Sequence, residues 1–256
     1  SFPTRRSSDL LLARRPRGGG IAAAPPATDG DIVALLRSSG IVSWAVALDG
    51  ASPEAALRNV LPATPVAAGG VVPGLVLPLA GFPPLDINDQ WPSRGLRQTR
   101  LRAAGLPIPT HGLGVLFQAR PPVTAGQTLA GIREDFAEEG GVAISIMPSG
   151  AVECWLGIDD DWIRLISDAG VMVPGRAYLA VAGFGGAGAA LYLANAQSAA
   201  PGVPVASSPL TSTIFSGAPL DIGANWSNSG AFSGAIALVW GYSATPGPAH
   251  IAALAS

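Results

Sequence analysis

Two glutamates in the segment REDFAEEGG have the residue type that glycosidase chemistry uses. Glu134 and Glu138 are four residues apart, so on a β-strand they would share one face at a separation of about 13 Å. A retaining glycoside hydrolase holds its two carboxyl groups about 5–5.5 Å apart. We therefore interpret this segment as an acidic, solvated loop between two strands. The chain also lacks the motifs G-x-S-x-G and HExxH and a phosphate-binding loop, so we expect no enzymatic activity from it.

A glycine pattern typical of dinucleotide sites runs from Gly183 to Gly188, in the sequence GFGGAG. Such a site needs a helix directly after the glycines, because the amides at the helix N-terminus bind the pyrophosphate. The residues that follow, AALYLAN, instead alternate between small and large side chains as a strand does. We interpret the pattern as a glycine-rich hairpin turn.

Two oxygen-rich loops are candidates for calcium. One contains Asp86, Asn88 and Asp89, and the other begins at Asp159 in the run of three aspartates at 159–161. Calcium takes six to eight oxygen ligands, at about 2.3–2.6 Å, and neither loop has the full EF-hand spacing. The alternative is a turn whose aspartate and asparagine side chains bond their own backbone. We expect no other cofactor.

Tryptophan is the residue type here that is best suited to stacking on a sugar ring. Of the six tryptophans, Trp162 and Trp226 flank polar loops, and together with Asp159 they are our candidate ligand-binding residues. The alternative for both tryptophans is core packing. Trp240 is predicted to be core, because it lies on the bulky face of an alternating segment.

The amino-acid composition of the chain limits the classes of molecule that it is expected to bind. The net charge is −2, and the fifteen basic residues are all arginine, which does not indicate a nucleic-acid-binding field. No apolar run reaches the length of about 18 residues that a membrane span requires. The single cysteine, Cys154, excludes an internal disulfide and a cysteine-rich zinc site, and we expect it to be buried. The bias toward Ala, Gly, Pro and Arg is typical of a GC-rich, bacterial genome.

The N-terminal region divides into three parts. Residues 1–10, SFPTRRSSDL, resemble a sequencing adapter translated in frame, so we exclude them from fold reasoning and expect the authentic N-terminus to be missing. Residues 11–29 are rich in Arg, Gly, Pro and Ala and are interpreted as a linker. Residues 30–70 form a short lead-in, either the remnant of an upstream domain or a segment packed on the next one.

Two helices and one strand are predicted within the lead-in. The apolar stripe of residues 30–38 predicts a helix that ends near Gly40. The segment 41–50 alternates as a strand does. Ser52 as N-cap, followed by Pro53 at the first helical position, predicts a second helix over 53–60.

From residue 71 onward the chain has the sequence pattern of an all-β domain. Short alternating segments separated by Gly, Pro, Asn and Asp predict an antiparallel two-sheet sandwich, with no helix between strands. The tightest predicted hairpins are at 148–150 and 158–161. The last residues, PGPAHIAALAS, predict a terminal helical turn. The predicted strands are 74–79, 112–120, 127–132, 141–147, 151–157, 161–167, 176–182, 189–195, 219–223 and 231–242.

The last of these strands sorts its side chains by size. Phe232, Ile236, Leu238, Trp240 and Tyr242 are predicted to share one bulky face, with small residues on the other. At about 1.5–3 kcal/mol for each large apolar side chain that is fully buried, this face requires a covering layer.

Residues 71–256 resemble the laminin G-like, concanavalin A-like jelly-roll domains of bacterial and phage proteins. The segments that carry the resemblance are GVAISIMPSGAVECWL, VPGRAYLAVAGFGGAGAALYLANAQ, PLDIGAN and FSGAIALVWGYSATPGPAHIAAL. The chain departs from the family pattern at Ala177, where Trp is usual, and at Asn195-Ala196, where Asn-Gly is usual.

The resemblance implies a non-catalytic module that binds a carbohydrate or a glycosylated surface within a larger bacterial or phage protein. It further implies an extracellular, cell-surface or virion location, with oligomers formed through the parent assembly. Two alternatives stay open, namely a structural or adhesive component of a phage tail or cell surface, and an accessory module of a truncated glycoside hydrolase.

Overall fold

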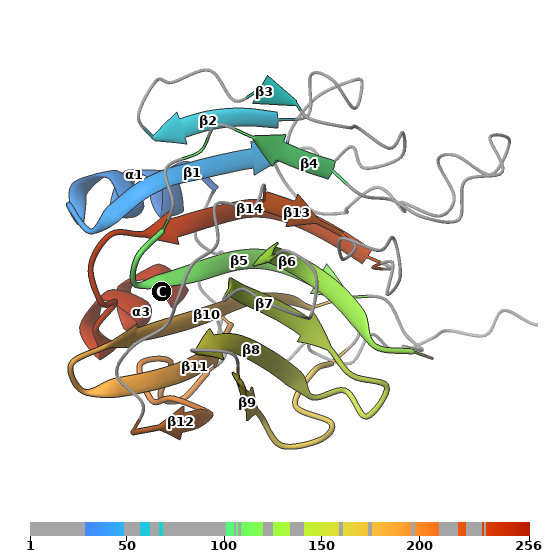
Figure 1. Ribbon diagram of the computed structural model, residues 1–256. Helices are drawn as coiled ribbons and strands as arrows, with labels where there is room; N and C mark the ends of the chain where they lie inside the picture. The colour runs from blue at the N-terminus through green and yellow to red at the C-terminus, as the bar shows by residue number, and fades with distance from the viewer. Residues whose placement is uncertain are drawn as a thin grey trace, which may run out of the picture.

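The computed structural model of the chain is an antiparallel β-sandwich. It describes residues 29–48, 57–61, 67–68, 101–104, 106, 109–119, 125–133, 141–158, 161–173, 176–195, 198–209, 220–223, 232 and 234–256. Their strands form two seven-stranded sheets in which every described pair of neighbours is antiparallel (Figure 1). The predicted all-β sandwich class is confirmed.

The first sheet, called sheet A here, brings together strands from both ends of the chain. Its order is β12 (Ala206–Ser208), β11 (Gly188–Ala194), β10 (Ala177–Gly185), β5 (Gly112–Ala119), β14 (Gly234–Tyr242), β1 (Val42–Leu48) and β2 (Leu57–Leu61).

The second sheet, called sheet B here, contains the consecutive strands from β6 to β9. Its order is β3 (Ala67–Ala68), β4 (Leu101–Ala104), β13 (Leu220–Ile222), β6 (Gln127–Arg133), β7 (Gly141–Ile146), β8 (Val152–Ile158) and β9 (Asp161–Ile166).

The inner faces of the two sheets enclose the main core. Phe117 of sheet A lies at its centre, where it stacks on Tyr178 and meets Phe232 edge to face, with ring centroids 6.1 and 6.3 Å away. Sheet B contributes an apolar row that includes Ile144 and Cys154, both fully buried. Cys154 is a free, buried thiol, as predicted.

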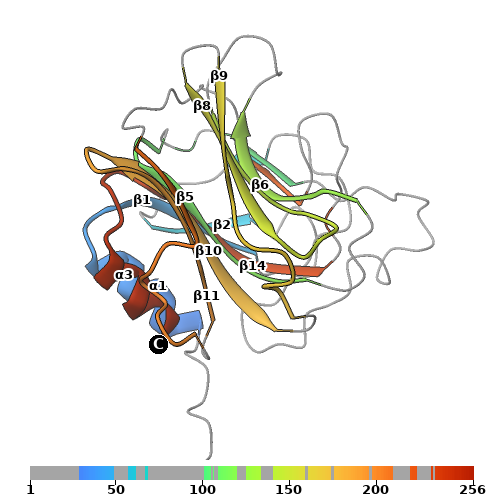
Figure 2. The same ribbon diagram turned by 90° about the horizontal axis from the view of Figure 1, so that it is seen from below.

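Two helices cover the outer face of sheet A and create a second core. The helices α1 (Asp29–Ser38) and α3 (Pro248–Ala255) lie side by side on this face, opposite sheet B (Figure 2). Leu36 of α1 and Ile251 of α3 are buried against Leu179, Trp240 and Tyr242 of the sheet. Neither described helix is long enough to cross a bilayer.

A β-bulge makes β14 serve both cores, and one sequence prediction is wrong for this reason. The adjacent residues Phe117 and Leu116 of β5 pair with Ile236 and Leu238, so β14 carries one extra residue between them. Ile236 packs into the core between the sheets, whereas Leu238 packs under the helices. The bulky residues of 232–242 therefore do not share one face, because an extra residue reverses the alternation.

Two tryptophans lie across glycines of neighbouring strands, on opposite faces of sheet A. Trp240 pairs with Gly114 on the helix side, and Trp44 pairs with Gly241 on the inner side. A Cβ atom built on either glycine would overlap the indole ring of its partner. Both tryptophans are fully buried, which confirms the core assignment of Trp240.

The lead-in is joined to the sandwich. The predicted helix over 30–38 is confirmed as α1, and β1 pairs with both β14 and β2. The described part of this segment therefore includes two strands of sheet A. The predicted helix over 53–60 is wrong, because residues 57–61 form strand β2, whose backbone groups pair with β1. Tertiary pairing here outweighs the helix-start signal of Ser52 and Pro53.

Most of the other predicted elements are confirmed with small changes at their ends. At the hairpin of 148–150, the N–H of Met147 donates to the carbonyl of Ala151 and the N–H of Gly150 donates to the carbonyl of Met147, and Gly150 has a φ of 75°. The glycine-rich turn joins β10 to β11, where Gly185 pairs with Gly188. The predicted strand at 74–79 lies outside the described residues, and three short strands, β3, β4 and β12, were not predicted.

Candidate functional site

Most of the site residues predicted from sequence lie outside the described residues. Trp162 is the exception: it lies on β9, is partly buried, and pairs with Gly157 of β8. In the described part of the chain, no group of three or more His, Cys, Asp or Glu side chains could hold a metal ion. The predicted site residues that lie outside the described part of the chain are Trp226 and Asp159, the proposed calcium ligands Asp86, Asn88 and Asp89, and the two glutamates Glu134 and Glu138.

The outer face of sheet B gathers polar and aromatic side chains on β8 and β9. In β8 the residues alternate, so Cys154 and Leu156 enter the core while Glu153 and Trp155 point to the opposite face. In β9, Leu165 faces the core. The outward-facing residues of β9 are Trp162, Arg164 and Ile166.

The register of the β8–β9 hairpin decides which of these side chains meet. Trp155 pairs with Arg164, and Glu153 pairs with Ile166. Arg164 is therefore beside Trp155 and diagonal to Glu153, within reach of both. This register follows from the short connection that joins Ile158 to Asp161, which confirms the hairpin predicted at 158–161.

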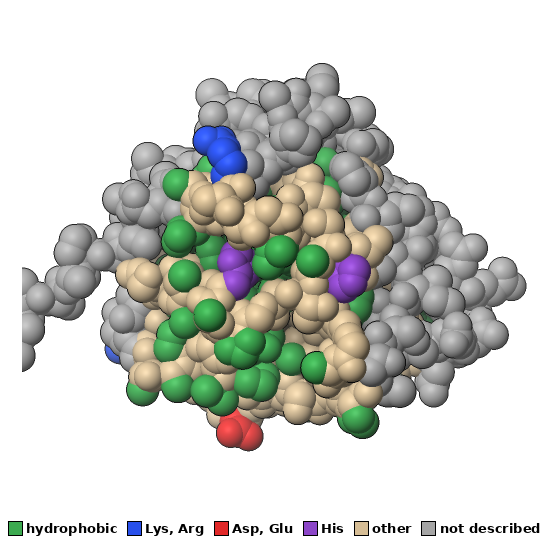
Figure 3. All heavy atoms as spheres, turned by 90° about the vertical axis from the view of Figure 1, so that its left-hand side faces the viewer, with side chains coloured by type: hydrophobic (Ala, Val, Ile, Leu, Met, Phe, Trp, Pro, Cys, Tyr) green, Lys and Arg blue, Asp and Glu red, His purple; other side chains and the backbone are tan. Residues whose placement is uncertain are grey.

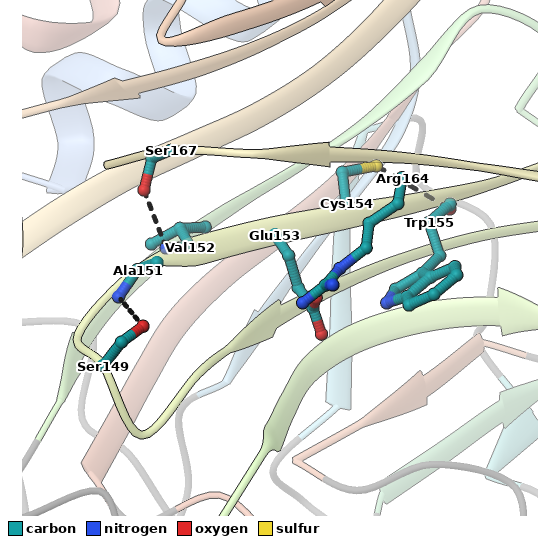
Figure 4. A network of polar contacts seen from close by, with 8 residues as sticks. All are labelled: Ser149, Ala151, Val152, Glu153, Cys154, Trp155, Arg164 and Ser167. Atoms are coloured by element: carbon teal, nitrogen blue, oxygen red, sulfur yellow. Dashed lines mark hydrogen bonds and ion pairs between the residues drawn. The ribbon is translucent and has the colours of Figure 1, made fainter. Parts of the chain in front are cut away.

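Arg164 binds both of these neighbours. Its Nε atom donates a hydrogen bond to Oε2 of Glu153 at 2.6 Å, and its guanidinium carbon lies 5.3 Å from the ring centroid of Trp155 (Figure 4). The distance to the ring is within the range of a cation–π contact. The three side chains thus form one connected group, which we call the Trp155 cluster.

Exposure within the Trp155 cluster is uneven. The side chain of Arg164 is 39% exposed and that of Glu153 only 8%. Trp155 is partly exposed, and Ile166, next to them on the same face, is 41% exposed. Ser145 of β7 pairs with Glu153 and is largely buried. Among the described residues of β8 and β9 on this face, Arg164 and Ile166 are therefore the most exposed, and Trp155 and Trp162 are partly exposed.

The cysteine between Glu153 and Trp155 takes no part in this surface. Burial raises the pKa of the Cys154 thiol, and the charge of Glu153 raises it further. The thiolate is the reactive form of cysteine, so Cys154 acts as a small apolar side chain.

The opposite side of the molecule offers a different surface. The end where α1 and α3 lie shows mainly hydrophobic and uncharged side chains among the residues coloured, with histidine nearer the middle and Arg, Asp or Glu side chains only at the margins (Figure 3). Beneath it, the hydroxyl of Tyr242 lies 3.1 Å from Nε2 of His250, and burial lowers the pKa of this histidine. Tyr242 is fully buried, so this pair ties α3 to the sheet rather than forming an open site.

Sequence reasoning missed Trp155, Glu153 and Arg164. The signal was present, because AVECWLG and DWIRLIS place apolar side chains on one face and charged or aromatic ones on the other. It became specific only once the register showed which residues are neighbours.

No protein-family model matches the chain, and no curated protein matches it. Among solved structures, it is similar to the sialidase CBM40 of Ruminococcus gnavus bound to α2,3-sialyllactose (13% identity, TM-score 0.47, covering 58% of this chain and 83% of that one). It is also similar to domain 4 of AbnA, an extracellular arabinanase of Geobacillus stearothermophilus, in complex with arabinotriose (18% identity, TM-score 0.45, covering 62% of this chain and 73% of that one). A third similar structure is the SAP-like pentraxin of Limulus polyphemus (13% identity, TM-score 0.43, covering 64% of this chain and 78% of that one). These likenesses concern the fold alone.

Proposed function

We propose that this protein is a non-catalytic carbohydrate-binding module whose ligand lies on the outer face of sheet B, at the Trp155 cluster. The observation that carries the proposal is a partly exposed indole that adjoins a paired guanidinium and carboxylate. The module would act outside the cell or on a cell or virion surface, where polysaccharide is found, as part of a larger protein.

Trp155 supplies the apolar half of such a site. A sugar ring presents C–H groups on its faces and hydroxyls around its edge, and an indole offers a flat apolar surface with a polar tip. Trp155 is partly exposed although it stands in the middle of β8, between buried neighbours. Ile166 extends the apolar surface along β9.

Arg164, held by Glu153, supplies the polar half. Arg164 carries five N–H donors, and its bond to Glu153 uses the one on Nε. A sugar hydroxyl both donates and accepts, so it can accept from the remaining N–H groups of Arg164. A few placed polar groups beside an apolar surface are what small-ligand sites share.

Sheet A does not offer an equivalent face. Its outer side is occupied by α1 and α3, and Trp240 and Tyr242 beneath them are fully buried. In the described part of the chain, no helix packs on the outer face of sheet B.

The proposal is tested by a glycan array on the whole chain, followed by calorimetric titration with galactotriose, arabinotriose and sialyllactose. Trp155→Ala is expected to lower the affinity for whichever sugar binds by tenfold or more. Val203→Ala is the matched control, because Val203 is a 60% exposed apolar residue outside sheet B. It should leave the affinity unchanged.

A folded sample that binds no sugar would refute the proposal, and so would a Trp155→Ala variant that binds as well as the parent. Trp162→Ala is a second arm of the test. If it abolishes binding while Trp155→Ala does not, the ligand lies toward Trp162 at the start of β9. An absence of sugar binding in a protein that forms stable oligomers would favour the alternative of a structural component of a phage tail or cell surface.

A further inference from the structure

We propose that Glu153 makes the Trp155 cluster select uncharged sugars against acidic ones. This inference rests on the proposed function and adds the chemical class of the ligand. A surface arginine beside a tryptophan would by itself favour a ligand carboxylate, because guanidinium and carboxylate pair through two parallel hydrogen bonds. The Glu153 carboxylate already occupies that position at 2.6 Å from Nε.

Arg164 is the only basic residue of β8 and β9. A ligand carboxylate that approached its terminal nitrogens would face the Glu153 carboxylate across the same guanidinium. Two like charges on one cation repel each other, which offsets the attraction of the second carboxylate to the arginine. The pair as a whole carries no net charge, and therefore gives an anionic sugar no electrostatic advantage.

Burial keeps Glu153 in place. Its side chain is only 8% exposed, whereas that of Arg164 is 39% exposed. A buried carboxylate that loses its partner is costly, so Arg164 cannot turn away to an external anion without leaving Glu153 unpaired. The contact of Arg164 with Trp155 at 5.3 Å holds the guanidinium from a second side.

An uncharged sugar meets the same groups without this conflict. Its hydroxyls can accept from the terminal N–H groups of Arg164 without adding a second negative charge, so the ion pair stays intact. Glu153 is thus a specificity-determining residue, which excludes anionic ligands from a face that would otherwise attract them.

The test compares galactotriose with trigalacturonate of the same linkage, which differ by oxidation of the primary hydroxyl to a carboxylate. The parent protein is expected to bind the neutral sugar at least tenfold more tightly. Glu153→Gln keeps the size and the acceptor oxygen of the side chain but removes its charge. This variant is expected to gain about tenfold or more for trigalacturonate and to change little for galactotriose.

Asp168→Asn is the matched control. It makes the same change in net charge at an exposed position after β9, so a general electrostatic effect would appear in both variants. A parent protein that binds the acidic sugar as tightly as the neutral one would overturn the inference, and so would a Glu153→Gln variant that gains no more than Asp168→Asn.

The glycan array decides the case in which neither trisaccharide binds. Binding confined to neutral glycans supports the selectivity, and acidic glycans bound as tightly as neutral ones refute it while the proposed function stands. A folded protein that binds no glycan of either kind refutes the proposed function, and the selectivity with it.

Discussion

Replacing Gly241 by alanine tests the cross-strand packing that holds sheet A together. A Cβ atom at this position would stand 2.6–2.7 Å from three atoms of the Trp44 indole. Non-bonded carbon atoms are comfortable at about 3.5–4.0 Å, so the ring or the strand must move by about 1 Å. Trp44 is fully buried in the core between the sheets, so a shift of its ring must displace the side chains packed around it.

The expected cost follows from two opposing effects. Overpacking a filled core costs about 1–3 kcal/mol. Replacing glycine by alanine returns about 0.4–1 kcal/mol, because the unfolded chain loses conformational freedom. The difference of these ranges is about 0–2.6 kcal/mol, and for a contact this close we expect a net destabilisation in its upper part, about 1–2 kcal/mol, measured by urea denaturation. For a domain of this size it corresponds to a fall in Tm of roughly 2–8 °C.

Two further variants make this measurement decisive. Gly186→Ala is the matched control, since nothing lies within 4 Å of a Cβ atom at that glycine, and it should change stability by less than about 0.5 kcal/mol. Trp44→Phe removes part of the overlapping ring, so the double variant should lose less than the sum of the two single variants. A neutral Gly241→Ala variant, or strictly additive losses, would refute the packing argument.

Three other predictions concern charged and ionisable groups. Arg164→Gln leaves the Glu153 carboxylate buried and unpaired, and should destabilise the fold by about 1–3 kcal/mol in urea denaturation; a smaller loss than that of Glu153→Gln would contradict this. Cys154 should react with a thiol reagent only as fast as the protein opens, because burial raises the pKa of its thiol; rapid labelling of the native protein would argue against a buried sulfur. Burial lowers the pKa of His250 below that of the unfolded chain, so the unfolded state takes up a proton first as the pH falls. Stability should therefore be full above about pH 6.5 and decrease as the pH is lowered through this value, and His250→Gln should flatten the profile; a parent protein whose stability rises on acidification over this range would have the opposite linkage.

Alternation of side chains was sufficient to predict most of the strands. It located β5 to β11 and β14 to within a few residues, because half-buried strands bury every second residue. It failed for β2, where Ser52 and Pro53 resemble a helix start but the backbone finds its partners on β1. It also failed at the bulge of β14, because an extra residue is defined only relative to the partner strand β5.

The candidate site was less accessible to sequence reasoning than the fold. Trp162 was recognised because a polar loop precedes it, whereas Trp155 stands in an apolar segment next to a cysteine and has the appearance of core. What distinguishes Trp155 is the face it takes on β8 and its register with Arg164. Both properties depend on the partner strand, which no single segment of the sequence reveals.

The extra residue in β14 has an evolutionary consequence. Before the bulge, the large side chains of β14 face the interior of the sandwich, and after it they face the helices. The alternation of side chains in the two halves of the strand is therefore shifted by one residue. If β14 paired with β5 without the bulge and kept Ala237, Trp240 and Tyr242 would point into an interior that is already filled, and α1 and α3 would lose the surface on which they rest. Deleting Ala237 would instead remove the bulge and leave each remaining side chain on its present face. A related domain with a regular strand at this place should accordingly be one residue shorter there.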